Sequence, residues 1–209
     1  MADGYFGGTF DPIHVGHLDV ARAARKALDL ERVWLVPARV PPHRATPQAS
    51  AAHRFAMAAL AIADSPGLSL SDLEQEDDAP SYTSTTLDRL ATRGVDTSTL
   101  FLITGADAFK DIAAWKDYPA ILDRAHFVVV ARPGASVAAV RSALPGLAPR
   151  FRETPCSIPS QPGIFLVDAP TAPVSSTTIR RATAAGESLA GLVPDAVAEY
   201  IARQGLYRR

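Results

Sequence analysis

Two histidines near the N-terminus are spaced so that they could bind one phosphate-bearing ligand. His14 and His17 are three positions apart, which puts their side chains on one face at the beginning of a helix. Each imidazole N–H group can donate a hydrogen bond to an oxygen on which charge develops during group transfer. The alternative is a pair of packing or capping histidines, and for the short motif alone that alternative is the more common one.

The residues before this pair have the composition of a phosphate-binding turn. Gly7 and Gly8 follow a candidate strand, and Thr9 and Phe10 lead towards a helix that is expected to start near Gly16. Glycines let the backbone approach a phosphate, and the first N–H groups of a helix lack intrahelical partners. The turn matches neither G-x-G-x-x-G nor a Walker P-loop, which disfavours a dinucleotide dehydrogenase and a phosphate-cleaving NTPase.

A second helix start of the same kind lies near the other end of the chain. Ser175 or Ser176 can cap this helix, while Thr177 and its free N–H groups face a phosphate and Arg180 follows one turn later on the same side. The alternative is an ordinary serine N-cap with solvated arginines. Two independent helix starts of this type are much less expected by chance than one.

Neither a protein-held metal nor a disulfide is expected. Cys156 is the only cysteine, so no intrachain disulfide or cysteine-based zinc site can form, and we assign this residue no role. The remaining histidines do not fall at a clear ligand spacing from His14 and His17.

Composition excludes several classes of protein. The 209 residues carry a formal charge of −1 and are 47% hydrophobic, as expected for a packed globular chain. This charge argues against a protein that works by neutralising nucleic-acid phosphates. No apolar run approaches the roughly 20 residues that span a bilayer, and the N-terminus lacks the features of a secretory signal. We therefore expect a cytoplasmic protein without nucleic-acid or membrane partners.

The elements that must position these residues alternate along the chain. Short apolar runs separated by Ala-rich helical stretches predict βαβ units, and hence one α/β domain over residues 1–209. Its Rossmann-like, doubly wound and mainly parallel sheet should carry helices on both faces. The runs Leu100 to Ile103 and Phe127 to Val130 are apolar throughout, as strands covered on both faces should be. The candidate strands are Tyr5 to Gly7, Val33 to Val36, Leu68 to Leu73, Leu100 to Thr104, Phe127 to Ala131 and Ile164 to Val167.

Helical stripes and loops complete this prediction. Apolar stripes include Leu18, Ala21, Ala24 and Leu28 in one helix and Phe55, Ala59 and Ile62 in the next. Ser50 is a candidate N-cap for the second helix, and Ser81 or Thr83 could start a third. Pro194 should open the last helix and Gly205 should end it. The loop of residues 38–49 follows a strand end, which favours a ligand role, and we expect variable surface over residues 145–163.

Further motifs reveal a resemblance that covers nearly the whole chain. They are Pro41-Pro42-His43-Arg44, Pro80-Ser81-Tyr82-Thr83, Gly105-Ala106-Asp107 with Trp115, Arg132-Pro133-Gly134, Ser175-Ser176-Thr177 with Ile179-Arg180, and the tail from Leu192 to Tyr207. Together with the first motif, their order and spacing resemble bacterial nicotinate-nucleotide adenylyltransferases, which belong to the nucleotidyltransferase superfamily with the H-x-G-H signature.

The resemblance implies roles for individual residues. His14, His17 and Arg180 would be catalytic and would bind the ATP phosphates. The other ATP-binding residues would be Gly7, Gly8, Thr9, Phe10, Gly16, Arg44, Ser176 and Thr177. On the acceptor side, Trp115 would stack on a pyridine ring, Thr83 would meet the nicotinate carboxylate, and Asp107 would lie near the nucleotide. Without the family, Trp115 is equally well explained as a core aromatic residue and Thr83 as an N-cap.

The sequence departs from the family pattern at three places. Asp3-Gly4 interrupts the first strand and leaves its start uncertain. Arg44 stands where Lys is common, so a planar fork replaces a point charge. Lys116 stands where Tyr is frequent, which affects the details of acceptor recognition.

The implied reaction joins ATP and nicotinate mononucleotide to give deamido-NAD and pyrophosphate, with Mg²⁺ bound through the ATP phosphates. Direct in-line attack needs no covalent intermediate. Three alternatives remain: an acceptor such as nicotinamide mononucleotide or phosphopantetheine, a non-catalytic nucleotide-binding regulator, and a nucleic-acid-binding module, which the neutral charge disfavours. The sequence is compatible with a homo-oligomer.

Overall fold

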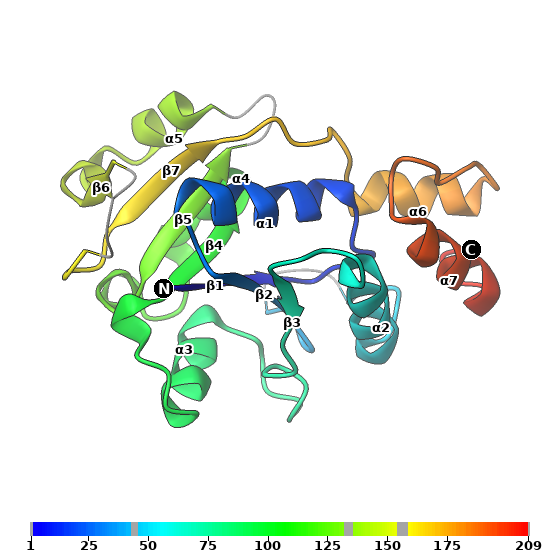
Figure 1. The fold of residues 1–209 in the computed structure, drawn as a ribbon, viewed down its shortest axis with the longest axis horizontal. Helices are drawn as coiled ribbons and strands as arrows, with labels where there is room; N and C mark the ends of the chain where they lie inside the picture. Colours follow the sequence, from blue (N-terminus) through cyan, green and yellow to red (C-terminus); the bar gives the residue numbers. More distant parts are fainter. Residues whose placement is uncertain (1, 43–45, 132–135, 154–158, 209) are drawn as a thin grey trace.

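One parallel sheet organises the chain (Figure 1). The computed structural model describes residues 2–42, 46–131, 136–153 and 159–208. Within these ranges seven strands pair in the order β3-β2-β1-β4-β5-β7-β6, and every pair is parallel. The strands are β1 (Asp3–Gly8), β2 (Arg32–Pro37), β3 (Leu68–Leu70), β4 (Phe101–Gly105), β5 (His126–Ala131), β6 (Phe151–Arg152) and β7 (Ile164–Asp168). The predicted Rossmann-like α/β fold is confirmed.

Helices cover both faces of this sheet. The α-helices are α1 (Val15–Ala27), α2 (Ala51–Ile62), α3 (Thr83–Thr92), α4 (Ala106–Phe109), α5 (Val137–Ala143), α6 (Ser176–Ala184) and α7 (Asp195–Gln204). One hydrophobic core holds Phe101 and Ile103 of β4 under α1, whereas Leu102 between them belongs to a second core with α3. Alternate side chains of one strand thus enter opposite cores, as strands buried on both faces require.

Several predicted boundaries and caps are confirmed. Ser50 caps α2, where its hydroxyl accepts a hydrogen bond from the His53 N–H group. Ser175 caps α6 in the same way, with the Thr178 N–H group as donor. Gly205 ends α7 in the left-handed conformation, at φ 61°, which glycine adopts without strain.

Two further predictions have mixed outcomes. Thr83 starts α3, as one of the two predicted starts, but the N-cap position that Thr83 also suited is occupied by Tyr82. The buried face of α2 contains Arg54 and Met57 rather than Phe55 and Ala59, because Arg54 turns inwards to bind main-chain carbonyls.

The segment from Pro145 to Gly163 also differs from the expected irregular surface. It contains a 3₁₀ helix (Pro145–Arg150) and the short strand β6, which pairs with β7. Because β6 has only two residues, it carries no detectable alternation in the sequence.

The doubtful start of the first strand has a packing explanation. β1 begins at Asp3, whose carboxylate accepts a hydrogen bond of 2.8 Å from the Trp34 indole N–H group. A Cβ atom at Gly4 would come within 2.8 Å of the side chains of Ile103 and Leu30. Gly4 is therefore part of a tightly packed strand and not an interruption of it.

Helices α6 and α7 lie at one side of the molecule, where α7 packs against α2 (Figure 1). His53 of α2 and Tyr200 of α7 are joined by a hydrogen bond of 2.9 Å. Among the described residues, no helix is both long and apolar enough to cross a membrane.

Buried His126 gives the fold a pH-dependent stability. This residue of β5 stacks on Phe101, and its Nδ1 atom accepts a hydrogen bond from the Gly163 N–H group. Burial lowers the pKa of His126 below its ordinary value of 6.5. Below pH 6.5 the unfolded chain binds a proton that the folded chain does not. The free energy of unfolding therefore decreases as the pH is lowered.

The His126→Gln variant should lose this contribution, since Gln accepts a hydrogen bond but does not titrate. We expect the wild type to lose up to about 1.4 kcal/mol more per pH unit than the variant below pH 6.5, until the folded-state pKa is reached. Urea unfolding between pH 7.5 and 5 measures both slopes. Parallel slopes would contradict this role for His126.

Candidate active site

A cleft of about 830 Å³ opens at the carboxyl ends of β1 and β4. The chain runs outwards from β1 through β2 to β3 and then returns to β4 on the other side of β1. This reversal is a topological switch point, where open α/β sheets bind their ligands. Most of the predicted site residues line this cleft: Gly7, Gly8, Thr9, Phe10, His17, Thr83, Asp107, Trp115 and Ser176.

The two histidines form a stacked pair at the start of α1. Their ring centroids are 3.6 Å apart with 23° between the ring planes. His14 is 1% exposed, whereas His17 is partly exposed on the wall of the cleft. The His14 N–H group donates to Nδ1 of His17 over 3.2 Å, so a neutral His17 ring carries its proton on Nε2. The structure thus orders the pair, with His17 in front and His14 behind it.

The glycines of the turn differ in what they allow. A Cβ atom at Gly8 would come within 2.6 Å of the Phe10 ring, and one at Gly16 would come within 3.1 Å of the Ala172 carbonyl oxygen. A Cβ atom at Gly7 would meet nothing within 4 Å in the described part of the chain, apart from its chain neighbours, although Gly7 lines the cleft. Packing therefore requires glycine at Gly8, whereas at Gly7 the open space belongs to the cleft.

The start of α6 is fastened to the same turn. The Ser176 hydroxyl donates to the Pro12 carbonyl over 2.9 Å. Arg180 Nη1 donates to the Asp11 carbonyl over 2.6 Å, and Nη2 donates to the Thr177 hydroxyl over 3.3 Å. The two helix starts that the sequence singled out are thus in direct contact.

Not all of the predicted residues reach the wall of the cleft. His14, Gly16, Thr177 and Arg180 lie outside it, although each contacts or neighbours a residue that lines it. The Arg180 guanidinium is held against the main chain of the turn. Arg44 and the neighbouring His43, the motif Arg132-Pro133-Gly134 and Cys156 lie outside the described residues.

The far end of the cleft has a different chemical character. Trp115 lies half-buried beside Phe127, with ring centroids 6.4 Å apart. Thr83, as the first residue of α3, presents the start of that helix to the cleft. Lys116 brings its ammonium to 5.3 Å from the centre of the Tyr82 ring. This end combines a flat aromatic surface with hydrogen-bond donors and a cation.

Comparisons with known proteins agree with this geometry. Residues 5–182 match the model of the cytidylyltransferase-like family. A probable nicotinate-nucleotide adenylyltransferase of Roseiflexus sp. (strain RS-1) is 42% identical, and the match covers 98% of this chain and 97% of that protein. The chain belongs to the nicotinate-nucleotide adenylyltransferase family. A second member, from Desulfatibacillum aliphaticivorans, is 39% identical over 99% of this chain and all of that protein.

Solved structures support the fold of this adenylyltransferase family member. Plasmodium falciparum nicotinic acid mononucleotide adenylyltransferase complexed with NaAD superposes with a TM-score of 0.76 at 18% identity, covering 99% of this chain and 97% of that one. The same enzyme complexed with APC gives a TM-score of 0.71, also at 18% identity, covering 99% and 96% of the two chains.

Sequence reasoning missed the charged residue that joins the loops of this adenylyltransferase fold. Arg54 of α2 is 1% exposed and donates hydrogen bonds to the carbonyls of Thr9 at 2.7 Å, Ala38 at 2.6 Å, Arg39 at 2.9 Å and Ala49 at 3.3 Å. Burial lowers the pKa of Arg54, and the nearby Asp11 carboxylate opposes that shift. The signal in the sequence was an arginine at helical spacing from Met57 and Ala58.

A second missed residue, Glu74, forms part of the cleft wall. It is 2% exposed, accepts from the Thr86 hydroxyl over 2.6 Å, and forms an ion pair of 2.8 Å with Arg89. Glu74 lies in an acidic run that reads as a solvated surface. Only the fold shows that one carboxylate of this run is buried.

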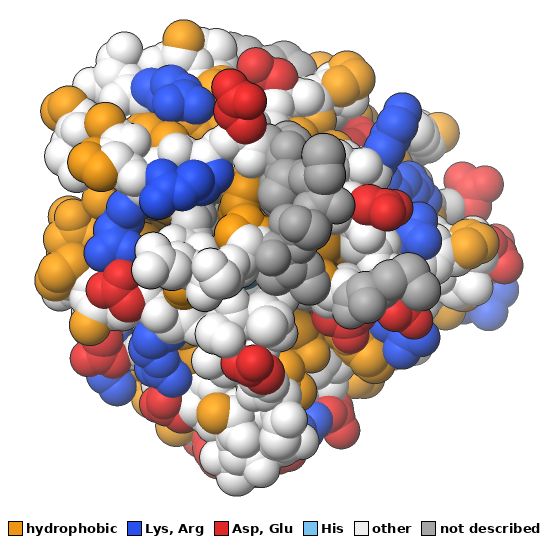
Figure 2. All heavy atoms as spheres, turned by 60° about the vertical axis from the view of Figure 1, so that its left-hand side comes forward, with side chains coloured by type: hydrophobic (Ala, Val, Ile, Leu, Met, Phe, Trp, Pro, Cys, Tyr) orange, Lys and Arg blue, Asp and Glu red, His pale blue; other side chains and the backbone are white. Residues whose placement is uncertain are grey.

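No group of three or more His, Cys, Asp or Glu side chains is arranged to hold a metal ion in the part of the chain that the structure describes. In the face that Figure 2 shows, basic and acidic side chains are interspersed and do not gather in a single basic patch.

Removing the charge of Arg54 should destabilise the whole loop assembly. Arg54→Met leaves the carbonyls of Thr9, Ala38 and Arg39 without this donor, and we expect a loss of about 3 kcal/mol in the free energy of unfolding. Arg203→Met is the matched control, because Arg203 is exposed and, among the described residues, its guanidinium forms an ion pair with Glu199 of α7 alone. This control should cost less than about 1 kcal/mol. Urea unfolding of both variants measures the difference, and equal losses would contradict the role of Arg54.

Proposed function

We propose that this protein transfers the adenylyl group of ATP to nicotinate mononucleotide, giving deamido-NAD and pyrophosphate. The observation that carries the proposal is a single cleft with two chemically distinct ends. At one end the histidine pair and the start of α6 meet. At the other end Trp115 and the start of α3 offer a surface for an aromatic ring that bears a carboxylate.

Direct in-line displacement fits this arrangement. A phosphate oxygen of the mononucleotide attacks the α-phosphorus of ATP. As that bond forms, the bond from the α-phosphorus to the bridging oxygen breaks, and pyrophosphate leaves with the electron pair. The nucleophile is already an anion at neutral pH, so the protein contributes positioning and charge stabilisation and needs no general base.

His17 is the residue best placed to stabilise the transferring group. Since its Nδ1 accepts from the main chain of His14, the remaining ring nitrogen Nε2 acts as a donor towards the phosphates. His14 supports that ring by stacking at 3.6 Å. Arg180 supplies positive charge from beside the turn. The remaining ATP contacts in this proposal are Gly7, Gly8, Thr9, Phe10, Gly16, Ser176 and Thr177, which lie on or next to the wall of the cleft.

Mg²⁺ enters this proposal with ATP and is not held by a protein cage. Of the acidic side chains on the cleft wall, Glu74 is occupied by Thr86 and Arg89, while Asp107 and Asp111 are exposed. Such a donor set fits an ion that keeps several waters and is carried mainly by substrate phosphates. When bound, Mg²⁺ neutralises part of the phosphate charge.

The acceptor end supports a pyridine mononucleotide. Trp115 offers its indole face for stacking, and the start of α3 at Thr83 places helix N–H groups where a nicotinate carboxylate can accept them. In this proposal Asp107, which lines the cleft, lies near the nucleotide. We infer a cytoplasmic enzyme whose reaction requires neither nucleic acid nor membrane.

Steady-state kinetics with purified protein, ATP and Mg²⁺ test this proposal directly. Pyrophosphate release should be fast with nicotinate mononucleotide and slower with nicotinamide mononucleotide. A preference for the amide would refute the substrate assignment. ATP binding without turnover on nicotinate, nicotinamide or phosphopantetheine acceptors would instead indicate a nucleotide-binding regulator.

His17→Ala tests the role of the front histidine. Because His17 is proposed to act on charge that builds up in the transition state, kcat should fall by about 100-fold or more, a typical loss for one such donor. Stopped assays of pyrophosphate at saturating ATP measure kcat. A variant with wild-type kcat and only a raised KM for ATP would show that His17 binds the ground state alone.

Gly7→Ala tests whether the open space at the end of β1 belongs to the ligand. Apart from its chain neighbours, the added methyl group meets no atom of the described residues within 4 Å, so stability should not fall. It should nevertheless weaken ATP binding by about tenfold or more, because backbone approach to the phosphates is blocked. Gly146→Ala is the control, since a Cβ atom there also meets nothing within 4 Å and Gly146 is outside the cleft. Isothermal titration measures the affinity of each variant for ATP. Equal affinities in Gly7→Ala and Gly146→Ala would show that the space at Gly7 is not used by ATP.

A further inference from the structure

A tyrosine near the C-terminus contacts the phosphate-binding turn from behind. Tyr207 is 7% exposed, and its hydroxyl donates a hydrogen bond of 2.7 Å to Oδ1 of Asp11. The chain reverses after α7 through Gly205 at φ 61°, and Tyr207 itself has φ 63°. A non-glycine residue keeps this conformation only where its surroundings hold it in place.

The Asp11 carboxylate is held by neutral donors. Oδ2 accepts from the Gln48 N–H group over 2.8 Å, and Oδ1 accepts from the Ala49 N–H group over 3.0 Å as well as from Tyr207. Arg180 Nη1 lies 3.9 Å from Oδ2, beyond hydrogen-bond distance. The Arg180 guanidinium therefore lies near the Asp11 carboxylate without forming a hydrogen-bonded ion pair with it.

The main chain of Asp11 connects this carboxylate to two residues of the proposed ATP site. Its carbonyl accepts the hydrogen bond of 2.6 Å from Arg180. The preceding residue, Phe10, packs edge-on against His17 with ring centroids 5.0 Å apart. A displacement of Asp11 therefore moves the support of both Arg180 and His17.

We propose that Tyr207 is a positioning residue of the adenylyl-transfer site, acting through Asp11 on Arg180 and His17. This inference rests on the proposed function. Burial, followed by the hydrogen bond to Asp11, raises the pKa of the Tyr207 hydroxyl, so Tyr207 stays a neutral donor throughout the physiological range. Without that donor, Oδ1 loses one partner and the Asp11 carboxylate becomes free to close on Arg180.

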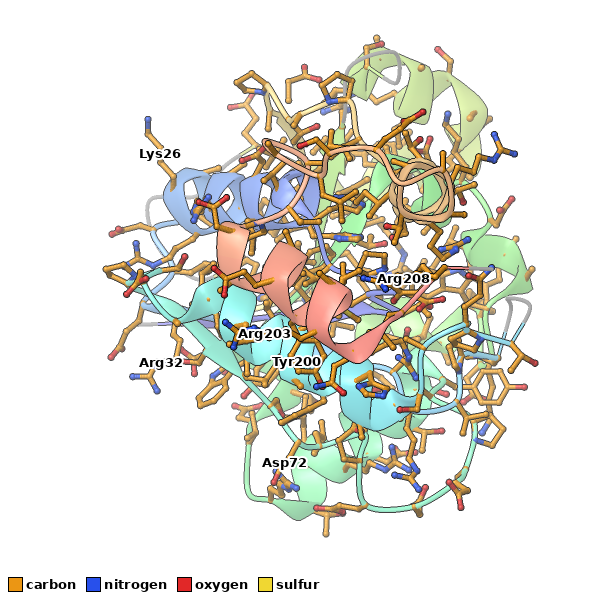
Figure 3. The ribbon with its side chains drawn as sticks, turned by 90° about the vertical axis from the view of Figure 1, so that its right-hand side faces the viewer. Lys26, Arg32, Asp72, Tyr200, Arg203 and Arg208 are labelled. Atoms are coloured by element: carbon orange, nitrogen blue, oxygen red, sulfur yellow. The ribbon has the colours of Figure 1, made fainter. Side chains whose placement is uncertain are left out.

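The chain offers a matched control for this tyrosine. Tyr200 in α7 also uses its hydroxyl in a long-range hydrogen bond, of 2.9 Å, to His53 of α2. Figure 3 shows Tyr200 on the face of α7 that meets α2. Tyr200→Phe therefore removes one hydroxyl contact of the same C-terminal region without touching Asp11.

The experiment compares Tyr207→Phe and Tyr200→Phe with the wild type. For Tyr207→Phe we expect kcat/KM for ATP to fall about tenfold, the effect of losing one hydrogen bond to a charged group. The KM for nicotinate mononucleotide should stay unchanged, because Asp11 is not among the described residues that line the cleft. Tyr200→Phe should remain within about twofold of the wild type in both parameters.

Three outcomes would overturn the inference. The first is an equal kcat/KM for ATP in the wild type and Tyr207→Phe. The second is an equal loss of kcat/KM for ATP in Tyr207→Phe and Tyr200→Phe. The last is a loss of kcat/KM for ATP in Tyr207→Phe that comes with an equally large rise in the KM for nicotinate mononucleotide. The last result would indicate general loosening, and melting temperatures of both variants would record it.

Failure of the proposed function would give a different pattern. If the wild type bound ATP but released no pyrophosphate, the same three proteins would be compared by isothermal titration with ATP. A Kd for ATP that is about tenfold higher in Tyr207→Phe alone would support positioning by Tyr207 without catalysis. Equal Kd values would overturn it.

Discussion

Two buried side chains of opposite charge, Asp11 and Arg54, hold the loops around the cleft in one arrangement. They grip the same residue from two sides, since Asp11 accepts from the Ala49 N–H group and Arg54 donates to the Ala49 carbonyl. Arg54 also binds the carbonyl of Thr9 in the turn after β1. The loop after β2 and the turn after β1 are thereby fixed to each other. This arrangement also sets the position of His14 and His17, which follow the turn.

This constraint explains how irregular backbone can line an active site without losing order. Loops carry polar main-chain groups that need partners when they are buried. Here a guanidinium with five N–H groups supplies four of those partners. The cost of burying its charge is offset by these hydrogen bonds and by the nearby carboxylate. Loops held in place in this way suit a reaction that depends on the positioning of its substrates.

Periodicity and motif order predicted the parts of the molecule that depend on local sequence. After His126, β5 is apolar throughout, and Ser50 and Ser175 precede helices in the way that caps require. The motifs also predicted that the starts of α1 and α6 serve one ATP site. Such helix starts lie near each other because parallel strands end at the same edge of a sheet.

The remaining features depend on contacts that local patterns do not record. The inward turn of Arg54, the burial of Glu74 within an acidic run and the contact of Tyr207 with Asp11 each join segments far apart in the chain. Thr83 shows the same limit at short range, because a residue suited to a cap became the first residue of the helix.

The hydrogen bond between Tyr207 and Asp11 spans 196 positions of sequence, and this separation has a consequence for the order of folding. Contacts between distant segments incur a large loop-closure entropy and are not favoured until intervening structure has brought their ends together. We therefore expect the sheet to assemble before this contact closes. In that order of events the phosphate site is completed late, after the protein has acquired its overall shape.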